Sequence, residues 1–146
     1  MKRFTLAAVV AAAMALCTSA VMHAGKPPDY TVTTKTYKLT PPRGTNFPNA
    51  SGSLTISIAG PIHDRYYTYY YNVTFFVQVW GLAPNRGYGV SPSKDASTGY
   101  YYVAGCTTDA DGNGSGSRTW RYGSPHGVPN TYSVVDLTTG VVELSN

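Results

Sequence analysis

The sequence has few charged residues and very little cysteine. Only 12% of its 146 residues are charged, and Glu143 is the one glutamate. The two cysteines are Cys17, in a leader-like N-terminal stretch, and Cys106. A chain that keeps only Cys106 cannot form an internal disulfide, so its stability must come from packing. Good helix formers are also scarce, which argues against a helical protein.

Long apolar stretches and basic clusters are missing as well. The apolar run over residues 4–16 is interrupted only by Thr5, and it is shorter than the ~20 residues that a membrane-spanning helix needs. Once Lys2 and Arg3 are removed with a leader, the formal net charge falls from +4 to about +2, and no basic cluster is left. The sequence therefore predicts neither a membrane span nor a nucleic-acid partner.

Residues 1–20 have the pattern of an export signal. Two basic residues precede the apolar run, and small residues follow it. This arrangement suits cleavage after Ala20, with Ala24 as the alternative position. Residues 21–29 are expected to form a flexible stub before the folded domain.

Cys17 raises the question of a lipid anchor. An anchored cysteine follows a small residue, whereas Cys17 follows Leu16, so we interpret it as part of the discarded leader. The protein is therefore expected to be secreted and extracellular, or to lie in the cell envelope, with the periplasm as one alternative.

The chain is rich in tyrosine, glycine and proline. All 13 tyrosines lie beyond the leader, and the chain has 15 glycines and 10 prolines. Aromatic and β-branched residues favour strands, and glycine and proline mark the turns between them. We expect one all-β domain over residues 30–146 with six to eight strands. The predicted strands cover residues 30–40, 53–59, 66–80, 100–107, 117–122, 131–137 and 141–144.

Residues 66–80 alternate in two rows along a predicted strand. One row is wholly apolar, and we expect it to face the core: Tyr67, Tyr69, Tyr71, Val73, Phe75, Val77 and Val79. The other row is mixed, and its aromatic members are Tyr66, Tyr70, Phe76 and Trp80. Large aromatic side chains on a polar face are costly to leave in water. The second row therefore predicts a face that binds a ligand or a neighbouring protein, or that is covered by the same chain.

Residues 81–90 contain the pattern Leu-x-Pro followed by Tyr-x-Val. Leu82, Pro84 and Tyr88 occupy the defining positions. The pattern resembles the tyrosine corner of fibronectin type III and related immunoglobulin-like domains. The resemblance implies an antiparallel Greek-key β-sandwich. It also implies that the Tyr88 hydroxyl bonds to upstream backbone and that Leu82 is buried, but it implies little about function.

Residues 109–114 combine acidic and amide side chains with glycine. Asp109, Asp111 and Asn113 alternate as calcium ligands do, but the twelfth position from Asp109 is Trp120 rather than a closing glutamate. An EF-hand loop is therefore excluded. A weak surface calcium site and an ordinary hairpin tip stay open, and the hairpin is favoured. If these residues form a hairpin tip, then residues 100–107 are expected to pair with residues 117–122.

Catalytic motifs are missing from the sequence. There is no Gly-x-Ser-x-Gly, no His-Glu-x-x-His and no phosphate-binding loop. His63 and His126 are expected in loops, and Cys106 is expected to be a small buried residue. We therefore expect a non-catalytic protein without a cofactor.

Three hypotheses about function follow. The favoured one is a structural or adhesion module that contacts copies of itself or another surface protein. The alternative is a carbohydrate-binding module that uses the aromatic face. The least favoured is a small hydrolase that uses Asp64 or Asp109.

Overall fold

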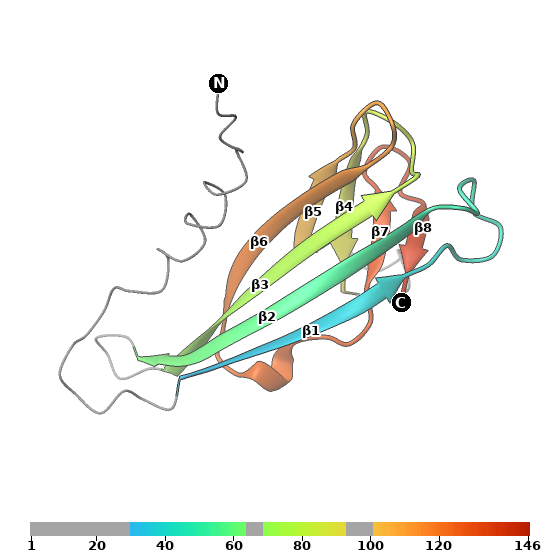
Figure 1. Cartoon of the computed structure of the whole chain (residues 1–146). Coiled ribbons are helices and arrows are strands. Elements are labelled where there is room, and N and C mark those ends of the chain that lie inside the picture. The colour runs from blue at the N-terminus through green and yellow to red at the C-terminus, as the bar shows by residue number, and fades with distance from the viewer. Residues whose placement is uncertain (1–29, 64–68, 93–100) are drawn as a thin grey trace, which may run out of the picture.

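Alternating apolar and polar residues form two stacked antiparallel sheets. The computed structural model describes residues 30–63, 69–92 and 101–146. The longer sheet contains β1 (Thr31–Leu39), β2 (Ser51–His63), β3 (Tyr69–Trp80) and β6 (Gly114–Tyr122), in that order. The shorter sheet has the order β5 (Ala104–Thr107), β4 (Gly87–Ser91), β7 (Ser133–Asp136) and β8 (Val142–Ser145). Figure 1 shows it behind the longer sheet. The all-β prediction is confirmed.

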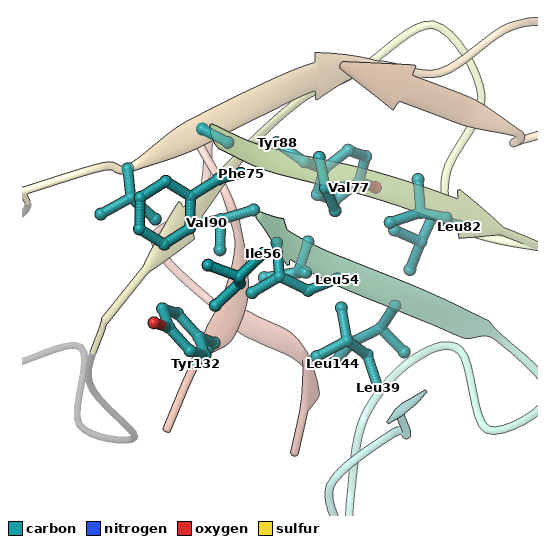
Figure 2. Close-up of a cluster of buried hydrophobic side chains, with 14 of the residues drawn as sticks. Leu39, Leu54, Ile56, Phe75, Val77, Leu82, Tyr88, Val90, Tyr132 and Leu144 are labelled. Carbon is teal, nitrogen blue, oxygen red and sulfur yellow. The ribbon is translucent and has the colours of Figure 1, made fainter. Parts of the chain in front are cut away.

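The hydrophobic core lies between the two sheets (Figure 2). From β3, four members of the apolar row are fully buried: Val73, Phe75, Val77 and Val79. Leu54 and Ile56 of β2 pack beside them, and Tyr88 and Val90 of β4 face them from the shorter sheet. The two-residue period thus identified the buried side of β3 correctly over these residues.

The same row was predicted wrongly at the start of β3. Tyr69 was expected in the core, but it is 53% exposed, and its ring lies 3.7 Å from that of His63, centroid to centroid. The strands β2 and β3 have 13 and 12 residues, whereas each strand of the shorter sheet has 4 or 5. The longer sheet therefore extends past its cover, as Figure 1 shows. Side chains there have no opposite sheet to pack against. Tyr66 and Tyr67 lie outside the described residues.

The predicted pairing of residues 100–107 with residues 117–122 is also wrong. β5 lies in the shorter sheet beside β4, and β6 lies in the longer sheet beside β3. Between these two segments there is one isolated bridge, which joins Thr108, just after β5, to Gly114 at the start of β6. The turn at residues 109–113 is tight, as expected, but it carries the chain from one sheet to the other.

Both lateral edges of the two-sheet stack are joined by backbone contacts. On one side, Thr40 and Ser145 each donate an N–H to the other's carbonyl oxygen, at 2.8 Å in both directions. On the other side, β5 and β6 approach so closely that a Cβ on Gly116 would lie 2.0 Å from the Gly105 carbonyl oxygen. These two seams fix how the sheets face each other.

Candidate ligand-binding face

The outer side of the longer sheet is lined mainly by serine and threonine. The register of the four strands aligns these residues in rows across the sheet, such as Thr34, Ser57, Thr74 and Thr119. Hydroxyl groups bond to one another at 3.2 Å between Thr34 and Ser57 and at 2.8 Å between Thr74 and Thr119. We call this surface the hydroxyl face, defined as Thr34, Thr36, Ser53, Thr55, Ser57, Thr74, Ser115, Ser117 and Thr119. Its short side chains, several of them bonded to one another, make it flat. The register places a cation near each end of it, with Lys38 opposite Ser53 and Arg121 opposite Asn72.

Aromatic side chains of β3 project from the hydroxyl face. Phe76 is 38% exposed and Trp80 is 42% exposed. Tyr70 is half-buried, with the Arg121 guanidinium 4.8 Å from its ring centroid. At about 3.3 Å per residue, Phe76 and Trp80 lie about 13 Å apart along the strand. The described members of the mixed row thus share one side of one strand.

A hollow of about 510 Å³ opens at the Trp80 end of the hydroxyl face. The side chains around it come from β3, β5, β6 and the turn between the last two. They include Gln78, Trp80, Thr107, Asp109, Asn113 and Ser115. The hollow is shallow and largely open to solvent, so a group bound there would keep one side in water. The fold therefore brings together Trp80 and the acidic turn, which the sequence suggested as two unrelated candidates.

The turn beside the hollow is held by the carboxylate of Asp109. Its Oδ1 accepts the backbone N–H groups of Asp111 and Asn113, each at 2.9 Å. Gly112, at φ +78°, lies against the Leu82 carbonyl, where any Cβ would lie 2.1 Å from the oxygen. One oxygen of the proposed calcium ligand is therefore used to close the turn. Among the residues that the structure describes, no three His, Cys, Asp or Glu side chains gather around a common point for a metal ion.

The loop after β3 braces the other side of this turn. Tyr88 is 1% exposed, and its hydroxyl accepts the Ala83 N–H at 3.1 Å. Thr108 Oγ1 donates to the Ala83 carbonyl at 2.6 Å and accepts the Arg86 N–H at 3.0 Å. Leu82 is buried, as expected, and Pro84 is exposed. Burial raises the pKa of Tyr88, so its hydroxyl stays protonated at neutral pH.

A second polar cluster, which the sequence did not suggest, lies at the same end of the shorter sheet. Asp136 is 2% exposed, and its Oδ2 accepts a hydrogen bond from Arg86 at 2.8 Å. The equally buried Glu143 accepts one from Thr45 Oγ1 at 2.6 Å. Both side chains border a cavity of about 320 Å³. Each carboxylate ties a loop to a strand, and the only sequence signal was the rarity of acidic residues.

The pKa of Asp136 reflects two opposing effects. Burial alone raises it, but hydrogen bonds from the Thr138 N–H, from Arg86 and from the Thr139 N–H outweigh burial. The net result is a pKa below the usual carboxyl value. Asp136 is therefore an ionised structural anchor at neutral pH.

The remaining candidates for chemistry lie apart from the hollow. Cys106 is half-buried, and burial raises the pKa of its thiol to about 11, which disfavours the nucleophilic thiolate. His63 was wrongly expected in a loop: it is the last residue of β2, and its exposed ring contacts that of Tyr69 at a tilt of 56°. His126 lies exposed in the 3₁₀ turn Pro125–Gly127. Asp64, one of the aspartates in the hydrolase hypothesis, lies outside the described residues.

Comparison with known proteins gives no relative. No protein-family model matches the chain, and no curated protein or solved structure matches it either. Over residues 30–63, 69–92 and 101–146, no helix is both long and apolar enough to cross a membrane. Function must therefore be argued from the hydroxyl face and the hollow.

Proposed function

We propose that this chain is an exported, non-catalytic adhesion module with an immunoglobulin-like β-sandwich, and that it binds a neutral polysaccharide through the hydroxyl face. The export signal at residues 1–20 and the tyrosine-corner pattern support the location and the fold type. The partner is argued from the side chains on the longer sheet.

The exposure of Phe76 and Trp80 among the serine and threonine side chains of the longer sheet is the observation that supports this function most. Each ring buries a large area at small entropic cost when a sugar ring stacks on it. The surrounding serine and threonine side chains are short, and several already bond to one another. Little side-chain freedom is therefore lost when a flat ligand docks.

The spacing of the exposed rings favours a polysaccharide over a protein partner. Protein interfaces centre on a contiguous apolar patch from which water is excluded. Here Phe76 and Trp80 are separated by Gln78 and flanked by hydroxyl groups. Such an arrangement matches a polymer that presents apolar ring faces and hydroxyl groups in alternation.

Retention of the purified mature protein on insoluble neutral polysaccharides tests this proposal. We expect saturable binding to cellulose, chitin or a related polymer, and about tenfold weaker binding for Phe76→Ala and for Trp80→Ala. Leu137→Ala is the matched control, because Leu137 is an exposed apolar residue (53%) in the turn after β7 of the other sheet. It should bind like the wild type.

The outcomes separate the rival functions. Absence of retention on every polymer would overturn the proposal. If the protein instead forms dimers that Phe76→Ala abolishes, then the face is a contact between protein copies. Release of soluble sugars from the polymer would mean that the chain is a hydrolase.

A further inference from the structure

The hollow beside Trp80 differs chemically from the flat face that leads to it. Trp80 and Gln78 belong to β3, and Ser115 is the register partner of Gln78 on β6. The other lining residues include Thr107, which belongs to β5 of the shorter sheet, and Asp109 and Asn113, which belong to the turn between β5 and β6. A ligand in this shallow hollow would therefore lie beside one aromatic ring and beside polar side chains from β3, β5, β6 and the connecting turn. A ligand on the flat face would contact side chains of the longer sheet only.

We infer that this hollow is a recognition subsite for a single uncharged sugar ring, with Trp80 as the stacking platform and Gln78, Asp109 and Asn113 as hydrogen-bonding groups. The inference rests on the proposed function, because the ring belongs to the polymer that lies along β3. It adds that the protein also binds soluble oligosaccharides, and that the hollow selects among them.

Charge around the hollow decides which sugars fit. Asp109 contributes a carboxylate, and none of the residues lining the hollow is a lysine, arginine or histidine. Sugar hydroxyl groups can donate to the carboxylate, and such charge-assisted bonds are stronger than neutral ones. A uronic acid or sulfated sugar would place its own negative charge against Asp109. The hollow therefore favours neutral sugars.

Hydrogen bonds within the turn and to the loop after β3 hold the frame of the hollow, and of the binding side chains they use only Oδ1 of Asp109. Asp109 Oδ1 is occupied by the Asp111 and Asn113 N–H groups, so Oδ2 is the oxygen left for a ligand. The Asn85 N–H donates to the Asp109 carbonyl at 3.1 Å, and the Leu82 N–H donates to the Gly112 carbonyl at 3.1 Å. A turn that is already held in place lowers the entropic cost of binding.

Titration with soluble hexasaccharides tests the inference. Neutral glucan, mannan, xylan and chitin fragments, and a uronic-acid hexasaccharide, are added to the mature protein while tryptophan fluorescence and heat are recorded. We expect at least one neutral oligosaccharide to bind saturably and to change the tryptophan emission, and the uronic-acid fragment to bind at least tenfold more weakly. Because Trp120 also emits, the change is assigned to Trp80 by its loss in Trp80→Phe.

Variants locate the binding. Gln78→Ala and Asp109→Asn should each weaken the affinity about tenfold. The asparagine keeps an Oδ1 that can accept the turn N–H groups, so the turn itself should persist. Trp80→Phe should bind more tightly than Trp80→Ala, because a ring remains, and Leu137→Ala should match the wild type.

Failure of this inference is distinguishable from failure of the proposed function. If the protein is retained on an insoluble polymer but no soluble oligosaccharide binds, the flat face functions alone and the hollow is not a subsite. Unchanged affinity in both Gln78→Ala and Asp109→Asn would also overturn it. If neither soluble nor insoluble sugars bind, both proposals are wrong.

Discussion

Single side chains hold the loops at the Trp80 end of the molecule. Tyr88, Thr108 and Asp136 are each at most 3% exposed, and each bonds to backbone of a neighbouring loop or turn. A buried polar atom that loses its partner costs more than an exposed one, because water cannot replace the partner. Substitution at these residues should therefore lower stability without touching the hydroxyl face.

Removal of the Tyr88 hydroxyl tests its hydrogen bond with the Ala83 N–H. Tyr88→Phe should lower the free energy of unfolding by about 1 kcal/mol, since the Ala83 N–H loses its acceptor. Tyr37→Phe is the matched control. Its hydroxyl donates to Asn130 at the exposed surface, so its loss should cost less than about 0.5 kcal/mol. Urea unfolding measures both, and equal losses would contradict the assignment.

The lowered pKa of Asp136 predicts how stability depends on pH. A carboxyl whose folded-state pKa lies below the unfolded value of about 3.9 stabilises the fold above that value. The contribution is lost as the pH falls through the folded-state pKa. Asp136→Asn should therefore cost about 2 kcal/mol at pH 7. Its stability should also vary less than that of the wild type below about pH 4. Parallel stability curves for the two proteins would show that Asp136 does not titrate as described.

At the scale of the element, β3 separates the core from the hydroxyl face. Val77 is fully buried between the sheets, and the next residue, Gln78, points to the outside and borders the hollow. The difference between neighbouring residues is a consequence of strand geometry, since successive side chains point to opposite faces.

Paired substitutions on β3 measure this separation. Val77→Ala should destabilise the protein by about 2 kcal/mol more than Gln78→Ala, because it leaves a cavity in a packed core. Chemical denaturation of both variants checks the difference. Equal effects would mean that the two faces of the strand were assigned the wrong way round.

At the scale of the whole molecule, the seams between the sheets determine the shape of the hollow. The backbones of β5 and β6 lie close together at Gly105 and Gly116. Residues of the turn that joins these strands line one side of the hollow. A side chain at this seam would separate the two sheets near the hollow.

Insertion of a methyl group at the seam tests this role. Gly116→Ala should destabilise the protein by about 2–3 kcal/mol, because the added Cβ overlaps the Gly105 carbonyl oxygen. Gly123→Ala is the control, since a Cβ there has no heavy atom within 4 Å. Thermal unfolding compares them. A tolerated Gly116→Ala would show that the seam is loose.

The sequence by itself determined the strand class, the buried side of β3 from Val73 to Val79, and the exposed row with Phe76 and Trp80. These features depend only on local alternation, because the direction of a side chain in a strand is set by its position in the chain. Tertiary structure decided that Tyr69 is exposed, that β5 and β6 lie in different sheets, and that Asp109 and Trp80 line the same hollow. Those outcomes depend on which part of one sheet the other sheet covers, and on which strands lie at the edges where the two sheets join. These are contacts between residues far apart in the sequence, so the local alternation of apolar and polar residues does not predict them.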